Sequence, residues 1–241
     1  MREYLIEAAQ HAQRLGCDGF RLDHAHGATH GFWSAFRTAL RAVKPDAAIF
    51  GEITDTPELM RSFTGRMDGA LDFPLLELLR GFFVFGSVKA SQLDRALQQH
   101  FAYFGSGLVL PSFLDNHDMS RFLWSVGGDN RRLKLAALFQ FTLPQPPILY
   151  YGTEAGLSQR RALGRLEEAR LPMRWHEEQD LDLLDFYRRL IQLRRQTPGV
   201  WSAPHSTIYV NDEDGVYAFR CAGRVVVLNN QTSPRPLPCL T

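Results

Sequence analysis

The chain has 241 residues, a length that suits one large domain or a domain with a small appendage, and its apolar fraction of 45% is typical of a globular protein. Its 27 Lys and Arg residues nearly balance 26 Asp and Glu residues without any block of like charge, so neither nucleic acid nor a membrane is an expected partner. No apolar run is long enough to span a membrane and no signal peptide is recognisable, which favours a cytoplasmic location.

Most of the chain alternates short apolar runs with stretches of helical periodicity. The predicted helices cover residues 2–15, 32–43, 56–63, 75–85, 91–104, 131–143 and 183–195. The predicted strands cover residues 19–23, 47–51, 67–73, 108–114 and 146–152. Strands that alternate with helices predict an α/β fold with a parallel sheet.

After Pro198 the apolar pattern changes to a period of two. The expected strands are 207–210, 216–219 and 224–228, and they are separated by turn residues at 212–215 and 222–223. Three strands are too few to close a sandwich or barrel alone. We therefore predict a domain over residues 1–200 and the start of an all-β domain over 201–241.

The cysteines are Cys17, Cys221 and Cys239, which are odd in number and widely spaced. This spacing fits neither a disulfide framework nor a zinc site, so we expect free or buried thiols.

Acidic residues lie at or just beyond the ends of three of the predicted strands. They are Asp23, Glu52 and the Asp118 of the run Asp115-Asn116-His117-Asp118. The carboxyl ends of parallel strands meet at one rim, which is where such sheets place their sites. Converging carboxylates serve either as nucleophile and proton donor in a glycosidase or as oxygen ligands of Mg²⁺ or Ca²⁺.

Neighbouring residues favour sugar chemistry over a metal centre. Arg21 lies two residues before Asp23, so both side chains share one face of the strand, where the guanidinium would hold the acid ionised and oriented. A cation beside the acid suits a nucleophile and repels a metal ion. The histidines His24, His26 and His30 lie on a turn without thiols and are expected to contact solvent or substrate rather than zinc. A structural ion pair between Arg21 and Asp23 stays an alternative.

These motifs resemble those of the α-amylase family of retaining glycosidases, glycoside hydrolase family 13. The run Gly19-Phe20-Arg21-Leu22-Asp23 resembles its fourth-strand motif, Phe50-Gly51-Glu52 its fifth-strand motif, and residues 113–118 its seventh-strand motif. The segments 150–154 and 170–175 resemble its eighth strand and the region beyond it. The resemblance implies a (β/α)8 barrel fold and covers residues 2 to 230.

The resemblance also assigns roles. It implies that Asp23 is the nucleophile, Glu52 the acid/base and Asp118 a ligand of sugar hydroxyls. Arg21, His117, His26 and Asn116 would bind or orient the substrate, which would be an α-glucan or an oligosaccharide. Candidate stacking platforms for sugar rings, with ordinary packing as the alternative, are Trp33, Phe122, Trp124 and Tyr151.

Two departures from the family pattern stand out. The lysine-histidine pair that follows the family's nucleophile is replaced here by His26-Gly27. The first three barrel strands and the calcium-binding insertion have no counterpart, so we expect a partial barrel of about strands 4 to 8, no bound calcium and no cofactor. Such an open sheet would associate through its exposed edges.

Three functional hypotheses follow. The first is a retaining hydrolase of α-glucosidic bonds, with a transglycosylase or isomerase as its variant because both use the same glycosyl-enzyme intermediate. The second is a catalytically silent carbohydrate-binding fragment. The third is a metal-dependent α/β enzyme that uses the acids as ligands.

Overall fold

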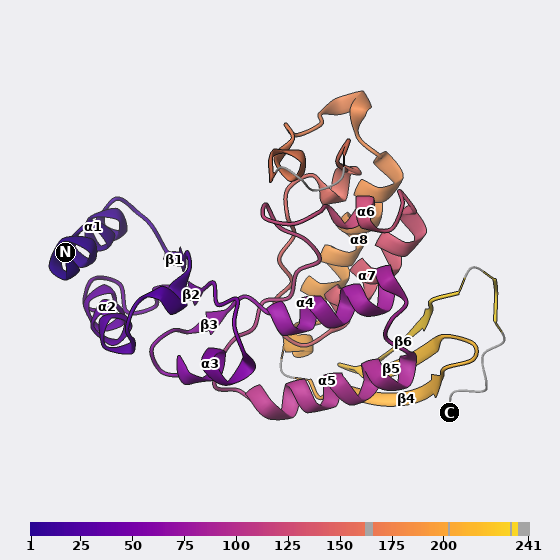
Figure 1. Cartoon of the computed structure of the whole chain (residues 1–241), viewed down its shortest axis with the longest axis horizontal. Coiled ribbons are helices and arrows are strands. Elements are labelled where there is room, and N and C mark those ends of the chain that lie inside the picture. Colours follow the sequence, from indigo (N-terminus) through magenta and orange to yellow (C-terminus); the bar gives the residue numbers. More distant parts are fainter. Residues whose placement is uncertain (162–165, 202, 232, 236–241) are drawn as a thin grey trace. The chain divides into compact units, whose positions relative to one another are not determined.

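The computed structural model describes residues 1–161, 166–201, 203–231 and 233–235, and Cys239 lies outside them. The chain has an α/β fold divided into two compact units (Figure 1). Unit 1 comprises Met1–Phe73 and Ala102–Pro111, and unit 2 comprises Pro74–Phe101 and Ser112–Thr241. Among the described residues, no helix combines the length and apolarity needed to cross a membrane.

Unit 1 is built around a short parallel sheet. Its elements in chain order are α1 (Arg2–Arg14), β1 (Gly19–Leu22), η1 (Ala25–Gly27), α2 (His30–Val43), β2 (Ala48–Gly51), α3 (Pro57–Ser62) and β3 (Gly69–Ala70). The strand order is β1-β2-β3, and Val109 extends the sheet by a parallel bridge to Gly69. The core of unit 1 holds Phe36 and Leu40 of α2 together with Ile49 of β2, so α2 packs its apolar side against the sheet.

Local sequence explains where the helices of unit 1 begin. The hydroxyl of Thr29 accepts a hydrogen bond from Phe32 N and starts α2. Thr56 caps α3 in the same way, and Pro57 occupies the first helical position. At the end of α1, Gly16 has a φ of +110°, which fits the predicted stop after this helix.

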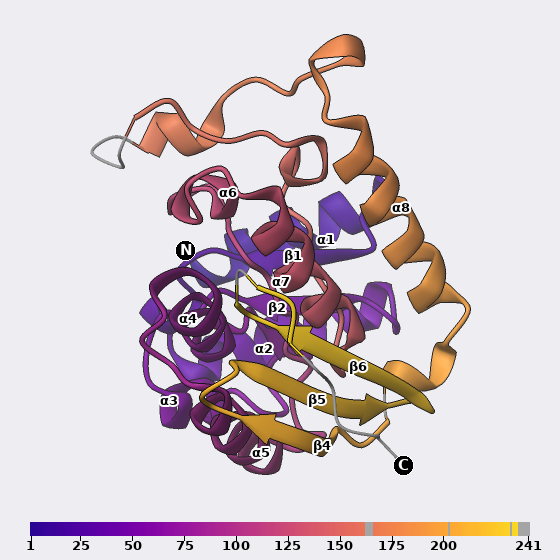
Figure 2. The ribbon, with the colours of Figure 1, turned by 90° about the vertical axis from the view of Figure 1, so that its right-hand side faces the viewer.

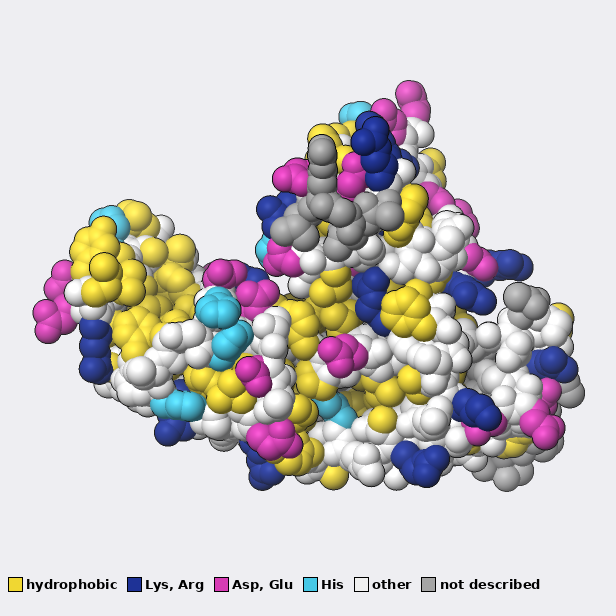
Figure 3. Space-filling model, viewed as in Figure 1, with side chains coloured by type: hydrophobic (Ala, Val, Ile, Leu, Met, Phe, Trp, Pro, Cys, Tyr) yellow, Lys and Arg dark blue, Asp and Glu magenta, His cyan; other side chains and the backbone are white. Residues whose placement is uncertain are grey.

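The apolar side chains of α1 are only partly covered. The side chains of Leu5 and Leu15 are exposed, whereas Ile6 and Ala9 pack against the core of unit 1. The apolar side chains of α1 lie on the left of Figure 3. In the described part of the chain, β1 pairs with β2 alone, so its other edge is open for pairing.

Unit 2 combines helices with an antiparallel sheet. It contains most of α4 (Phe73–Arg80) and α5 (Ala90–Phe104), together with η2 (Gly81–Phe85), α6 (Phe122–Ser125), α7 (Asn130–Thr142), η3 (Thr153–Ala155), η4 (Leu166–Arg170), η5 (His176–Glu178), α8 (Leu181–Arg195), η6 (Pro198–Trp201), β4 (Ser206–Asn211), β5 (Val216–Cys221) and β6 (Arg224–Asn229). The predicted helix over 75–85 forms, but residues 81–85 are a π-helical turn rather than α-helix, and this turn ends at Gly86 with a φ of +63°.

Strands β4, β5 and β6 lie side by side in Figure 2 and pair antiparallel in that order, as the period-two pattern predicts. Phe219 and Tyr217 of β5 are fully buried and pack against Phe139 of α7. Cys221 at the end of β5 is a buried free thiol, and Cys17 in unit 1 is an exposed one, as expected. A domain boundary near residue 200 stays a prediction.

The strands predicted over 108–114 and 146–152 do not form as continuous strands. Each segment makes only isolated parallel bridges, Val109 to Gly69 and Ser112 to Pro147. Proline has no backbone N–H, so the prolines at 111, 146 and 147 interrupt the ladder of hydrogen bonds. The third predicted strand is also shorter than expected, because β3 spans only Gly69–Ala70.

A partly buried histidine joins α5 to the antiparallel sheet. His205 Nε2 lies 2.6 Å from the hydroxyl of Tyr217, and its ring lies 4.5 Å from the ring of Phe219. The Tyr217 hydroxyl also donates to Asp94 of α5 over 3.3 Å. Burial lowers the pKa of His205 to about 4, although Asp94 opposes this effect.

We expect this histidine to make the protein sensitive to acid. Its pKa is lower in the fold than in the unfolded chain, where it is about 6.5, so the unfolded state binds more protons between these values. The free energy of unfolding should therefore rise with pH from about 4 to 6.5 and be constant above, with a total effect of at most about 3 kcal/mol. Denaturant titrations across this pH range measure it.

His205→Phe should flatten this pH dependence because the phenyl ring fits among Phe219 and Tyr217 and does not titrate. His176→Asn is the matched control, since His176 is an exposed histidine of the same unit. An equal pH dependence for the His205→Phe variant and the unchanged protein would contradict the assignment.

Candidate active site

The predicted acids of unit 1 follow two paired parallel strands. Leu22 of β1 is in register with Gly51 of β2, so Asp23 and Glu52 leave the sheet at the same level. Glu52 N donates to Leu22 O over 2.8 Å, and Ala25 N donates to Glu52 O over 2.9 Å. The backbone of Glu52 is thus held on both sides, by the residue before Asp23 and by the turn that follows it.

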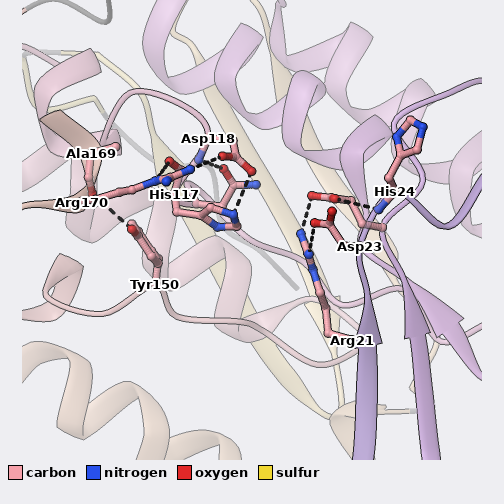
Figure 4. A network of polar contacts seen from close by, with 10 residues as sticks. Arg21, Asp23, His24, His117, Asp118, Tyr150, Ala169 and Arg170 are labelled. Carbon is pink, nitrogen blue, oxygen red and sulfur yellow. Dashed lines mark hydrogen bonds and ion pairs between the residues drawn. The ribbon is translucent and has the colours of Figure 1, made fainter. Parts of the chain in front are cut away.

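One guanidinium holds both carboxylates. Arg21 Nη1 pairs with Asp23 Oδ1, and Arg21 Nη2 pairs with Glu52 Oε1 at 2.6 Å (Figure 4). The Glu52 side chain is 12% exposed and that of Asp23 is 78% exposed. Two residues far apart in the sequence therefore present one shielded and one accessible carboxylate beside a shared cation. Charge-assisted hydrogen bonds of this kind fix the orientation of both acids.

The turn after Asp23 adds a backbone donor. His24 has a φ of +45°, an uncommon value for a residue with a side chain, and its N–H donates to Glu52 Oε2 over 3.3 Å. The carbonyl of Ala25 accepts from the indole N–H of Trp33 over 2.7 Å, which anchors this turn to α2. Trp33 is buried, so the suggestion that it stacks on sugar rings is wrong for this residue.

The three histidines of this turn have different surroundings. The rings of His24 and His26 lie 4.1 Å apart. His30 stacks on Phe63 at 4.5 Å and lies 2.7 Å from Ser62 Oγ, so its ring is engaged by α3 and the residue after it. His26 is partly buried, and its role as a substrate contact stays a prediction.

In unit 2, the predicted residues 116–118 form a second polar group. Asn116 Oδ1 accepts from Asp118 N over 2.8 Å, and His117 Nε2 lies 2.9 Å from Asp118 Oδ2. Arg170 Nη2 binds Asp118 Oδ1 at 2.8 Å, and Arg170 Nε donates to His117 O over 3.1 Å (Figure 4). Both oxygens of the Asp118 carboxylate are therefore oriented by cationic or imidazole groups.

Asp115, at the start of the same run, has a structural role. It is buried, its Oδ2 accepts from Phe122 N over 2.8 Å, and its Oδ1 accepts from the Thr153 hydroxyl over 3.2 Å. Burial raises the pKa of the Asp115 carboxyl. Phe122 is fully buried as well, so it cannot stack on a sugar, whereas Trp124 and Tyr151 are partly exposed.

Two arginines of unit 2 received no role from the sequence. Arg170 belongs to a segment that resembles the family, but nothing in the sequence places it against Asp118. Arg121 is fully buried, and its Nε and Nη1 donate to Ala169 O at 2.9 Å and Tyr151 O at 2.6 Å. The only sequence signal for Arg121 is its position three residues after Asp118.

Residues 1–181 match the family model described as alpha amylase, catalytic domain. The chain belongs to the alpha-amylase family. The matched range contains all predicted site residues, and the family resemblance seen in the three strand-end motifs is confirmed.

Relatives and solved structures agree with this assignment. Alpha-amylase 2 of Dictyoglomus thermophilum is 37% identical over 86% of this chain and 38% of that protein. A cyclomaltodextrinase of a Bacillus species is 30% identical over 100% of this chain and 44% of that protein. A crystal structure from Thermus thermophilus superposes with a TM-score of 0.86 and 30% identity, covering 97% of this chain and 52% of that one. The chain thus spans about two fifths of the length of these curated relatives.

Proposed function

We propose that the protein is a retaining glycoside hydrolase that cleaves α-glucosidic bonds of α-glucans or oligosaccharides through a covalent glycosyl-enzyme intermediate. The observation that carries this proposal is the Arg21 guanidinium that binds Asp23 and Glu52 at the ends of adjacent parallel strands. Family membership supports it, as do the names of relatives such as alpha-amylase and cyclomaltodextrinase.

The two acids have complementary roles in this mechanism. The Asp23 carboxylate attacks the anomeric carbon while Glu52 gives its proton to the leaving glycosidic oxygen, so the glycosidic bond breaks and an ester to Asp23 forms. Glu52 then takes a proton from water, the water oxygen attacks the anomeric carbon, and the ester bond breaks. Double displacement returns the sugar with its α configuration.

Exposure of the two carboxylates fits this division. The accessible Asp23 can reach an anomeric carbon, whereas the shielded Glu52 is held by Arg21 and by the His24 N–H. Arg21 would keep the two carboxylates oriented through both steps. A cation between the acids also argues against their use as ligands of a divalent metal.

The second polar group would bind the substrate. Asp118 would accept hydrogen bonds from sugar hydroxyls, and His117 and Arg170 would orient its carboxylate. Asn116 would shape this turn through its bond to Asp118 N. His26 would contact the sugar on the leaving-group side, in place of the family's lysine-histidine pair.

For the architecture, we propose a partial (β/α)8 barrel of about strands 4 to 8 over residues 1–200, followed by an incomplete antiparallel β domain over 201–241. The parallel sheet of unit 1 and the antiparallel sheet β4–β6 support this division. The open edge of β1 supports association through the barrel edge. The expectation that no calcium binds stays a prediction.

Incubation with maltooligosaccharides tests the proposed function. Shorter products that first appear as α-anomers in NMR spectra are expected, and Glu52→Gln should remove nearly all of this activity. Glu58→Gln is a control on an exposed glutamate of α3. Longer chains or isomerised products would favour the transglycosylase. Equal low turnover of the unchanged protein and Glu52→Gln, with glucan binding retained, would favour the silent fragment.

A further inference from the structure

Arg121 is buried among backbone carbonyl groups in the interior of unit 2. Its Nε donates to Ala169 O over 2.9 Å and its Nη1 to Tyr151 O over 2.6 Å. The guanidinium lies 4.0 Å from the ring centre of Tyr150 and 4.7 Å from that of Tyr151. A buried charge is costly, and these contacts offset part of that cost while they tie Arg121 to the backbone at Tyr151 and Ala169.

The residues that Arg121 contacts lead directly to Asp118. Ala169 O accepts a second hydrogen bond, from the Tyr150 hydroxyl, over 3.2 Å (Figure 4). The next residue along the chain is Arg170, which binds Asp118 Oδ1 and His117 O. The position of the Arg170 side chain therefore depends on a carbonyl that Arg121 and Tyr150 hold.

The contacts between the two segments are reciprocal. Arg170 reaches from η4 to residues 117–118, and Arg121, three residues further along that loop, reaches back to Ala169 in η4. Two arginines thus fasten the loop 117–121 to η4 at two points. A shift of η4 would separate Arg170 from Asp118 and leave one carboxylate oxygen without its cation.

We propose that Arg121 is a positioning residue that fixes Asp118 for substrate binding through Ala169 and Arg170. This inference rests on the proposed function, because it concerns the group that would hold the sugar. Arg121 itself is fully buried, so it would act through other residues rather than through contact with the sugar. Arg121 would influence the orientation of the Asp118 carboxylate, because that orientation depends on where the Arg170 guanidinium lies.

A double-mutant cycle tests the proposal. Arg121→Lys, Arg170→Ala and the double variant are compared by KM and kcat on maltooligosaccharides. Each single variant is expected to raise KM about tenfold, because a misplaced ligand weakens substrate binding. In the Arg170→Ala background, Arg121→Lys should change KM less than about twofold, since both act through the same contact.

Matched variants separate positioning from stability. Arg194→Lys alters another buried arginine of unit 2, whose hydrogen bonds go to carbonyl groups at the end of α7, so it should lower the melting temperature without changing KM. Tyr150→Phe removes only one donor to Ala169 O and should raise KM by less than Arg121→Lys does. It serves as the second variant if Arg121→Lys does not fold.

Hydrogen exchange distinguishes failure of this inference from failure of the proposed function. Peptides covering residues 166–173 should exchange their amide hydrogens faster in Arg121→Lys than in Arg194→Lys, when each variant is measured under conditions that give both the same free energy of unfolding. If the unchanged protein does not cleave glucans, the proposed function fails and the exchange measurement alone decides the role of Arg121. Additive effects on KM, unchanged KM, or equal exchange in the two variants would overturn the inference.

Discussion

Asp23→Asn is expected to lower kcat on maltooligosaccharides by at least about a thousandfold, because an amide cannot form the glycosyl ester. Glu52→Gln should lower kcat by roughly 10² to 10⁴ on the same substrate, since it removes only the proton transfer. Both amides are similar in size to the acids, so the fold of unit 1 should persist. Rates measured with maltotetraose, together with melting curves, check both statements.

The two acids can be told apart with a substrate whose leaving group needs no proton. On α-glucosyl fluoride, Glu52→Gln should form the glycosyl-enzyme at nearly the normal rate but hydrolyse it slowly, because no base activates water. Mass spectrometry should then find a glucosyl adduct on the peptide that contains Asp23. Asp23→Asn should form no adduct with any leaving group.

Asp46→Asn is the control, because Asp46 is an exposed acid of the same unit. It should leave kcat unchanged within about twofold, as expected for a surface substitution. An adduct on a residue other than Asp23, or an Asp23→Asn variant of nearly normal activity, would contradict the assigned roles.

The group around Arg21 could be predicted from sequence because it depends on two simple geometric rules. Side chains two residues apart on a strand share a face, which places Arg21 beside Asp23. The carboxyl ends of neighbouring parallel strands meet, which places Glu52 near both. The structure brings these three residues together through the Arg21 guanidinium.

The elements that differ from the prediction do so for separate physical reasons. The residues over 108–114 have the composition of a strand, but prolines leave them only isolated bridges. The π-helical turn at 81–85 continues an apolar helical pattern, and its different hydrogen bonding has no periodic signature. Helical periodicity predicted α1, but periodicity alone does not tell whether the apolar side chains of a helix, such as Leu5 and Leu15, are covered.

Arg121 and Arg170 escaped sequence reasoning for a related reason. A charged residue in a loop is ordinarily exposed, so the sequence predicts a solvated side chain at such a position. Arg121 is fully buried only because carbonyl groups from two distant segments, at Tyr151 and Ala169, converge on it. Convergence of this kind is a property of tertiary structure, and it becomes visible only with coordinates.

Arg194→Met is expected to destabilise unit 2 by about 3 to 5 kcal/mol, the largest stability effect that we predict. Arg194 lies in the last turn of α8 and is buried. Its Nη1 donates to Phe141 O at 2.8 Å and Leu143 O at 2.9 Å, and its Nη2 donates to Gln145 O. These carbonyl groups lie at and beyond the end of α7, where the helix has no partners of its own for them.

This effect is expected because three backbone carbonyl groups lose their hydrogen-bond donor at once. Burial lowers the pKa of Arg194 to about 10, so the guanidinium is still charged at neutral pH and donates strong hydrogen bonds. Methionine fills a similar volume but donates none, so buried carbonyl oxygens lose their partners. A melting temperature lower by about 10 °C is expected for a chain of this size.

Arg195→Met is the control, because it alters the exposed neighbour on the same helix and should shift the melting temperature by no more than about 2 °C. Equal melting temperatures for Arg194→Met and Arg195→Met would show that α7 ends stably without the guanidinium.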